Sequence, residues 1–244
     1  MTTTTTTTTN GRLGNQIIRN LAVSLIAEKY NLYVEYCNKS LINDLGINLF
    51  TGKEKFNNMI TLDDNNYFSI YNCNKLENNL NPNSNFFQTK DITNFLYNYL
   101  HKDEIKSNII NKNQFNNRYN ANNDLFIHIR LTDIAHYNPG VNYYIKTIKT
   151  INFDNLYISS DDPTHAIIQE IIKQYPTSII IKYDEIKTFQ FASTCKHIIL
   201  SHGSFSAVIG YLSFYSTIHY PEYEPNKIWH GDMFSIDGWI KHHP

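Results

Sequence analysis

Four short segments carry the residues that could do chemistry, and they share one feature. Each joins the end of an expected strand to a following helix or loop: Gly11–Gln16, His128–Asp133, Ser159–Asp162 and Ser201–Ser206. Glycine turns and helix N-termini present backbone N–H groups without intrahelical partners, and such groups bind anions, above all phosphates. Arg130 adds a permanent cation that can hold a diphosphate through two parallel hydrogen bonds. The pattern therefore predicts a site for a phosphate-bearing ligand.

Each of these residues also has a structural interpretation. His128 alternates with apolar residues in its strand, as a buried core histidine does. Arg130 could pair with a surface carboxylate, and Asp133 could orient Arg130 or cap the next helix. Asp162 and Ser204 each stand where a helix N-cap is expected. GRLGNQ is neither the G-x-G-x-x-G fingerprint nor a Walker A loop.

The first half of the chain begins with a run of threonines, Thr2–Thr9, which is either a low-complexity tail or a β-strand. We favour the strand because threonine is β-branched and because a glycine turn and a helix follow. Apolar residues recur at three- and four-residue spacing within Ile17–Tyr30, which predicts that helix. Leu32–Val34 resembles a second strand, so the segment forms a βαβ unit whose turn lies at the carboxyl edge of a parallel sheet. Between Leu41 and Leu100 only a helix near Thr93–Leu100 is predicted.

The second half alternates strands with helices. Strands are predicted at Leu125–Ile129, Leu156–Ser159, Ser178–Lys182 and His197–Leu200. Helices are predicted at Asn142–Thr150, Pro163–Tyr175, Lys187–Cys195 and Ser204–Tyr215, with Asp162 as the N-cap of the second and Pro163 as its first residue. This alternation is typical of a parallel α/β sheet.

An asparagine-rich segment, Asn108–Asn123, separates the two halves, and its turn-forming composition is typical of a linker. We therefore predict one Rossmann-like domain over residues 1–115 and a second over residues 124–244. The predicted fold class is α/β, with two Rossmann-like halves facing a cleft.

Composition restricts the class of protein. The chain has 244 residues, with 21 Lys and Arg against 22 Asp and Glu, so it lacks the excess of basic residues that nucleic-acid binding needs. Hydrophobic residues make up 41 %, enough for a sizeable core. The cysteines, Cys37, Cys73 and Cys195, are far apart and never in a C-x-x-C pair. This favours a reducing compartment over a disulfide framework or a zinc site.

The sequence also bears on membranes and targeting. No stretch approaches ~18 consecutive apolar residues, the length of a membrane-spanning helix. Met1 and the threonine run have neither the basic nor the apolar region of a signal peptide. We therefore expect a cytoplasmic protein whose contact with membranes is at most peripheral.

The same segments resemble the motifs of a known enzyme family. GRLGNQ resembles the N-terminal signature shared by α-1,2-fucosyltransferases and protein O-fucosyltransferases. HIRLTD, residues 128–133, is similar to their H-x-R-R-x-D motif, and LYISSDDP, residues 156–163, is similar to a segment of the α-1,6 relatives. FASTCKHIILSHGSFSAVIGYL, residues 191–212, resembles the C-terminal motif of the α-1,2 family. The blocks stand in family order and run from Gly11 to Leu212, so the resemblance spans nearly the whole chain.

The resemblance implies a GT-B fold, GDP-fucose as the donor, a glycan hydroxyl as the acceptor, and inverting transfer without a metal or other cofactor. The N-terminal domain is then the acceptor side, and the C-terminal domain binds the nucleotide sugar. Arg130 matches the arginine that contacts the donor pyrophosphate and is the expected catalytic residue. The implied donor-binding positions are Gly14, Asn15, His128, Arg130, Asp162, Ser204, Phe205 and Ser206. The implied supporting positions are Gly11, Gln16, Asp133 and Asp161.

The residues agree with metal-independent transfer. The sequence contains no Asp-x-Asp motif, the usual metal clamp of metal-dependent transferases, since Asp63–Asp64 and Asp161–Asp162 are adjacent pairs. Arg130 and helix amides would then stabilise the charge that develops on the departing diphosphate. No residue stands out as the general base that an inverting reaction needs.

Two positions depart from the family pattern. Leu131 replaces the second arginine of H-x-R-R-x-D, as in protein O-fucosyltransferases, which leaves the donor and the linkage open. Ala207–Val208 follow the S-F-S turn, where the family has paired tryptophans. Two alternatives therefore remain: a transferase for another GDP- or dTDP-linked deoxyhexose, and a catalytically silent module that binds nucleotide sugars or glycans.

Overall fold

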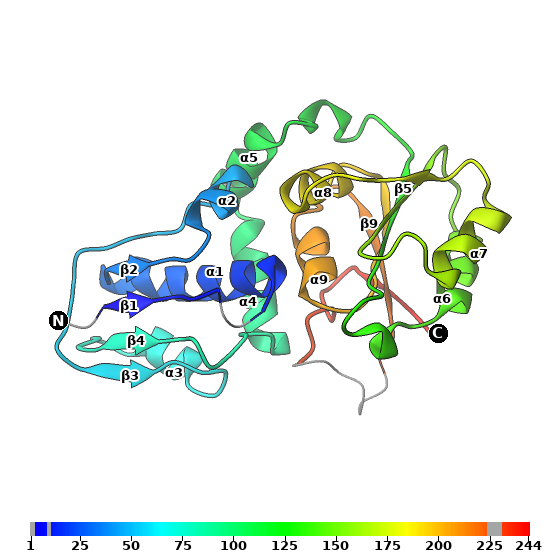
Figure 1. The fold of residues 1–244 in the computed structure, drawn as a ribbon. Helices are drawn as coiled ribbons and strands as arrows, with labels where there is room; N and C mark the ends of the chain where they lie inside the picture. Colours follow the sequence, from blue (N-terminus) through cyan, green and yellow to red (C-terminus); the bar gives the residue numbers. More distant parts are fainter. Residues whose placement is uncertain (1–2, 9–10, 224–230) are drawn as a thin grey trace. The chain divides into compact units, whose positions relative to one another are not determined.

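The computed structural model describes residues 3–8, 11–223 and 231–244, and it divides into two compact units (Figure 1). Unit 1 consists of Met1–Ile109 and His230–Met233, and unit 2 of Ile110–Trp229 and Phe234–Pro244. The boundary at Ile109–Ile110 lies inside the segment that the sequence predicts as a linker. Each unit is described below by itself.

Unit 1 opens with the predicted βαβ segment. Strand β1, Thr4–Thr5, pairs in parallel with β2, Val34–Glu35, and helix α1, Leu13–Tyr30, connects them. Within the described part of the threonine run, Thr4–Thr5 form the predicted strand. Helix α1 begins four residues before the predicted Ile17, so Gly14, Asn15 and Gln16 belong to its first turn rather than to a loop. The turn is already made at Gly11, whose φ is 88°, and nothing in LGNQ prevents helix from that point.

Helix α1 is buried along nearly its whole length. It packs against α4, Lys90–Leu100, and α3, Tyr67–Asn72. Its buried residues include the fully enclosed Arg19 and Asn20, which are unusual in a helix core. The helix ends at Asn31, which adopts the left-handed conformation that commonly terminates helices.

The rest of unit 1 consists of short elements. Strands β3, Met59–Thr61, and β4, Asn79–Asn81, form a second two-stranded parallel sheet. Helix α2, Lys39–Asp44, also belongs to this unit, and helix α5, Asp103–Lys112, crosses its boundary with unit 2. The helix predicted near Thr93–Leu100 is confirmed as part of α4.

Unit 2 is built on a six-stranded sheet in the order β10-β9-β8-β5-β6-β7, in which every pairing is parallel. Its strands are β5 (Leu125–Ile129), β6 (Leu156–Ser160), β7 (Ile179–Ile180), β8 (His197–Ile199), β9 (Thr217–Pro221) and β10 (Ile240–His242). The four predicted strands are confirmed, and β9 and β10 were not predicted. The chain runs outward from β5 to β7, returns to β8 beside β5, and then runs outward to β10. This is the doubly wound, Rossmann-like order, and its switch point lies between β5 and β8.

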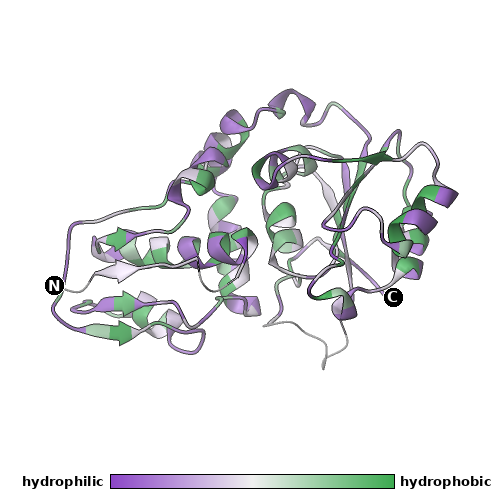
Figure 2. Cartoon of the chain, viewed as in Figure 1, coloured by the Kyte–Doolittle hydropathy of each residue, from purple (hydrophilic) through white to green (hydrophobic). Residues whose placement is uncertain are grey.

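Helices cover both faces of this sheet. Figure 1 shows α6 (Val141–Ile148) and α7 (Ala166–Gln174) on one face, and α8 (Glu185–Ala192) and α9 (Ser204–Tyr211) on the other. The core of the first face joins side chains of β5, β6 and β8 to α6 and α7. In Figure 2, α7 carries both hydrophobic and hydrophilic residues, whereas α9 is mostly hydrophobic, as a buried helix is. Within the described residues, no helix combines the length and the apolar character needed to cross a membrane.

Helix α7 starts later than predicted. The expected start was Pro163 with Asp162 as the N-cap, but the first helical residue is Ala166. His165 is the N-cap, and its ring Nδ1 accepts the N–H of Ile167. The Asp162 carboxylate is already used by the preceding turn, where it accepts the N–H of Thr164 at 3.1 Å and its hydroxyl at 2.7 Å.

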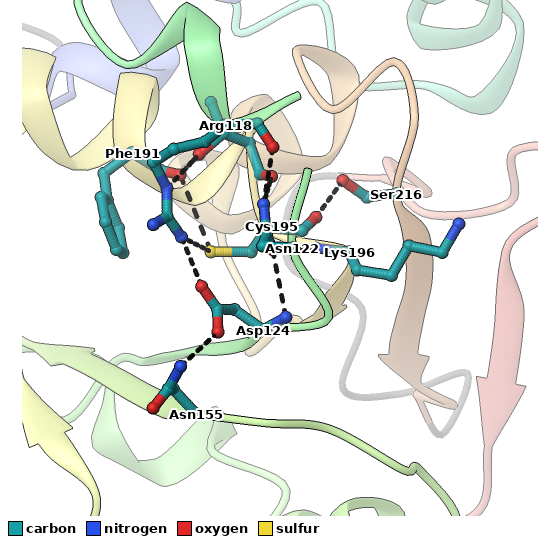
Figure 3. A network of polar contacts seen from close by, with 9 residues as sticks. Arg118, Asn122, Asp124, Asn155, Phe191, Cys195, Lys196 and Ser216 are labelled. Atoms are coloured by element: carbon teal, nitrogen blue, oxygen red, sulfur yellow. Dashed lines mark hydrogen bonds and ion pairs between the residues drawn. The ribbon is translucent and has the colours of Figure 1, made fainter. Parts of the chain in front are cut away.

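The segment predicted as a linker is ordered where it approaches β5 (Figure 3). Arg118 donates to Asp124 at 2.7 Å and to Thr194 at 3.1 Å, and its guanidinium lies 4.5 Å from the centre of the Phe191 ring. The Asn122 amide donates to the Thr194 carbonyl at 2.9 Å. The prediction of a linker throughout Asn108–Asn123 is therefore wrong for this part, because Arg118 and Asn122 belong to unit 2 and are hydrogen-bonded within it instead of remaining solvated.

Candidate functional site

Arg130 is the first residue after β5, and two carboxylates hold its guanidinium. Nη2 lies 2.5 Å from Oδ1 of Asp133, and Nη1 lies 2.8 Å from Oδ2 of Asp161. The arginine side chain is only 13 % exposed, against 53 % for Asp133 and 18 % for Asp161. The Arg130 carbonyl accepts the amide of Asn138 at 3.0 Å, so the backbone is fixed as well. Arg130 is therefore a positioned cation rather than a free surface side chain.

Asp161, at the end of β6, is the inner of the two carboxylates. It accepts the Leu131 N–H at 2.7 Å and the Thr132 hydroxyl at 2.6 Å in addition to pairing with Arg130. Burial acts to raise the pKa of Asp161, but the hydrogen bonds from Thr132 and Leu131 and the Arg130 charge outweigh it, so the pKa lies below its usual value. Asp161 is thus a stable anion that fixes the loop after β5.

The second part of the candidate site is the turn at Gly203 and the start of α9. It follows β8, which lies across the switch point from β5, the strand that precedes Arg130. Gly203 has a φ of 88°, which favours glycine, and it precedes Ser204, the first residue of α9. Among the residues that the structure describes, no side chain caps this helix. Its first N–H groups lack intrahelical acceptors, and the helix dipole places partial positive charge there. Ser204 and Phe205 are half-buried, so this end of α9 reaches the surface of unit 2.

Inside the core, His128 on β5 and Ser206 on α9 connect the two parts of the candidate site. His128 Nδ1 lies 2.6 Å from Ser206 Oγ, which also accepts the Ser201 N–H at 3.1 Å. Burial lowers the pKa of His128 to about 3, so the ring is neutral at pH 7. Phe205 stacks on the His128 ring at 5.0 Å and on Phe189 at 4.1 Å. His128 and Ser206 therefore set the position of α9 against β5.

Tyr144, on α6, holds Ser201, in the segment between β8 and α9, by a hydrogen bond. The Tyr144 hydroxyl donates to Ser201 Oγ at 3.0 Å, and this oxygen lies 3.2 Å from the ring of His202. Tyr143 and Tyr144, on α6, are both fully buried. The hydrogen bond from Tyr144 to the end of β8 had no signal in the sequence, because it depends on how α6 packs on the sheet.

The predicted residues of GRLGNQ lie in unit 1. A side chain at Gly11 would clash with Asn15, 2.2 Å from its Nδ2, so the two residues are closely packed. Asn15 Oδ1 accepts the Gln88 amide at 2.7 Å, and Gln16 donates to the Gly11 carbonyl at 2.8 Å. Gly14 is buried on the first turn of α1. These contacts fix the turn at the carboxyl end of β1.

The structure thus brings most of the predicted site residues of unit 2 to one edge of its sheet. Arg130, Asp133 and Asp161 stand at the ends of β5 and β6, and Ser204–Ser206 follow β8. Asp162 follows Asp161 directly in the sequence, but its carboxylate accepts hydrogen bonds from Thr164 in the next turn. No protein-family model matches the chain, and no curated protein matches it significantly.

Two features give this edge the chemistry of an anion site. Ligands of doubly wound sheets bind outside the carboxyl ends of the strands at the switch point, which here is the edge that carries Arg130 and the start of α9. Asp133 is exposed and pairs with Arg130 across three residues, an arrangement that contributes little stability. An incoming phosphate can therefore take the place of Asp133 on Arg130 while Asp161 keeps the guanidinium in position.

Proposed function

We propose that unit 2 binds the diphosphate of a nucleotide sugar and that the protein is an inverting, metal-independent glycosyltransferase. The proposed reaction transfers fucose from GDP-fucose to a hydroxyl of a glycan acceptor. The observation that carries the proposal is the position of Arg130 and the uncapped start of α9 on the two sides of the β5/β8 switch point. The resemblance of the sequence motifs to fucosyltransferases supports the choice of sugar.

Arg130 has the leading role in this proposal. As the glycosidic bond breaks, negative charge develops on the leaving diphosphate, and a positioned guanidinium stabilises it without reorganisation. The first N–H groups of α9 supply further donors for the same charge. Asp161 acts through Arg130 as a positioning residue, and His128 and Ser206 act through α9. Gly11–Gln16 of unit 1 would contribute in a GT-B-like arrangement, in which unit 1 holds the acceptor.

A second donor is favoured by one specific observation. Leu131, which stands in place of the family's second arginine, is only 4 % exposed and belongs to the core between β5 and α6. The Leu131 side chain therefore packs in the core and does not supply the charge of a second arginine. The second candidate is therefore transfer of another nucleotide-linked deoxyhexose by the same site.

A panel of nucleotides and nucleotide sugars tests the proposal. Thermal stabilisation by GDP, UDP and dTDP identifies the base, and donor hydrolysis or transfer identifies the sugar. We expect stabilisation by GDP and release of GDP from GDP-fucose in excess EDTA. Absence of stabilisation by every nucleotide would refute nucleotide binding, and activity that requires added Mn²⁺ would refute metal independence.

A further inference from the structure

Two histidine side chains meet at one edge of the six-stranded sheet of unit 2. Nδ1 of His219, on β9, lies 2.8 Å from Nε2 of His242, on β10. The register pairs His219 with Ile240, and residues two apart on a strand share a face, so His242 is the diagonal neighbour of His219 on that face. The two ring centres are 5.0 Å apart. One nitrogen of each ring therefore faces the other across β9 and β10.

The surroundings of both rings suit a metal ligand. His219 is buried, with 5 % of the residue exposed, and His242 is half-buried. Burial lowers the pKa of both rings, so both are neutral at pH 7. Neutral imidazole is the form of histidine that binds metal ions. Because His242 is only half-buried, an ion can reach the pair from solvent.

Hydrogen bonding alone does not account for this group of rings. Within the described residues, the other nitrogen of His219, Nε2, is buried and has no hydrogen-bond partner. His197, on the neighbouring strand β8, has a buried Nδ1 that is also unpartnered in that part of the chain, and its ring centre lies 6.5 Å from that of His219. Buried polar atoms in native proteins are usually paired, so these two orphaned nitrogens beside the His219–His242 contact are a second sign of a ligand site.

We propose that His219 and His242 bind a divalent transition metal ion such as Zn²⁺. Two imidazole nitrogens that are each about 2.0–2.1 Å from one ion lie about 3 Å apart, so a small rotation of the rings turns the hydrogen-bonded pair into two ligands. The ring that donates the hydrogen bond changes its tautomer, and its hydrogen goes to the outer nitrogen, so neither ring loses a proton. Imidazole nitrogen selects Zn²⁺, Cu²⁺ or Ni²⁺ over Mg²⁺ and Ca²⁺, which prefer oxygen ligands.

Two protein ligands define the kind of site. Among the described residues, no group of three or more His, Cys, Asp or Glu side chains is arranged to hold a metal ion, so water would complete the coordination. Such a site binds its ion more weakly than a closed four-ligand zinc site. It joins β10, a three-residue and largely exposed edge strand, to β9. An ion bound there therefore stabilises the C-terminal edge of the sheet.

The test uses the native full-length protein without a histidine tag and without nucleotide or sugar. Titration calorimetry with Zn²⁺ measures binding, and amide hydrogen exchange with and without Zn²⁺ locates it. We expect Zn²⁺ to bind and to slow exchange at Ile240–His242, whereas Mg²⁺ should do neither. Failure to bind Zn²⁺, or binding that leaves exchange of β10 unchanged, would overturn the proposal. Neither result bears on the proposed glycosyl transfer, which involves neither histidine.

Variants then identify the ligands. His219→Gln and His242→Gln should each lower the Zn²⁺ affinity by about tenfold or more, because each removes one of two ligands. His243→Gln is the matched control, since it removes an exposed imidazole next to His242 that pairs with Glu222, and it should change the affinity by less than about twofold. Loss of binding in His243→Gln instead would assign the ion to His243 and Glu222 and refute the proposal. If His219→Gln does not fold, His242→Gln, on the exposed edge strand, decides the question.

Discussion

At the scale of single residues, Asp133 and Asp161 hold the same guanidinium but differ in burial. Asp161 also accepts the Leu131 N–H and the Thr132 hydroxyl. We expect Asp161→Asn to lower the free energy of unfolding by about 1–3 kcal/mol, because it disrupts a partly buried charged network. Asp133→Asn should change it by less than about 1 kcal/mol, because the Asp133 carboxylate is largely exposed to solvent. Urea denaturation measures both.

Asp161→Asn and Asp133→Asn also distinguish two roles in ligand binding. Asp161 orients Arg130, whereas Asp133 competes with the phosphate for it. Asp161→Asn should weaken GDP binding, because Arg130 loses the partner that orients it. Asp133→Asn should leave GDP binding unchanged or make it tighter, because it removes the group that phosphate displaces. Calorimetric titration with GDP measures the affinities, and the opposite order would contradict the roles assigned to these carboxylates.

The lowered pKa values of three buried histidines in unit 2 make the stability of the protein depend on pH. Burial lowers the pKa of His128 to about 3, and that of His202 and of His219 to about 4. The unfolded chain therefore binds more protons than the folded chain between pH 6.5 and pH 4, and stability falls as the pH decreases through that range. Denaturation at pH 7.5, 6 and 5 should show a decreasing free energy of unfolding. His128→Gln should reduce the slope, and equal stability at pH 7.5 and pH 5 would contradict the account.

At the scale of elements, two helices of unit 2 start in the same way. Gly203 precedes α9 with φ 88° and ψ 163°, and Gly140 precedes α6 with φ 86° and ψ 161°. Neither position is crowded, since a Cβ at Gly203 would be 3.7 Å from its nearest neighbour and one at Gly140 would meet nothing within 4 Å. Gly→Ala at either position should therefore cost about 1–3 kcal/mol through backbone strain alone, because this conformation is essentially restricted to glycine.

Only one of these helix starts belongs to the proposed site. Gly203→Ala should weaken GDP binding several-fold, because it disturbs the N–H groups at the start of α9. Gly140→Ala should lose similar stability but bind GDP like the native protein. Thermal shift with and without GDP measures both effects, and equal GDP responses of the two variants would remove α9 from the site.

The sequence predicted the elements that bury a continuous apolar segment. Strand β5 is buried at every position, and its bounds agree with the prediction. Strand β10 was missed because Ile240–His242 is a short and largely exposed edge strand. Strand β9 was missed because Thr217–Pro221 mixes polar residues and a proline with few apolar ones.

The site was predictable in part for a physical reason. The carboxyl ends of parallel strands meet at one edge, so the segments after β5 and β8 were expected to converge. The pairing of Arg130 with Asp161 was not predictable, because it depends on the register of β5 against β6. That register sets Ile129 opposite Ser160, so the next residue on each strand, Arg130 and Asp161, come together.

At the scale of the whole molecule, the chain divides into two units, so a variant in one unit tests what that unit contributes to binding or transfer. Arg130 lies in unit 2, whereas the GRLGNQ turn lies in unit 1. If unit 2 alone holds the nucleotide, then Asn15→Ala should leave GDP binding intact and impair only transfer. Loss of GDP binding in folded Asn15→Ala would instead show that unit 1 contributes to holding the nucleotide.

The central claim is that Arg130 binds the diphosphate, and one measurement tests it most directly. GDP binding and GDP-fucose turnover are compared in the native protein, in Arg130→Ala and in Lys196→Ala, which removes an exposed cation just before the start of β8. We predict that Arg130→Ala loses most GDP stabilisation and about 10²–10³ in turnover rate, while its melting temperature without ligand changes little. Lys196→Ala should behave like the native protein. Native GDP binding and turnover in folded Arg130→Ala would contradict the account.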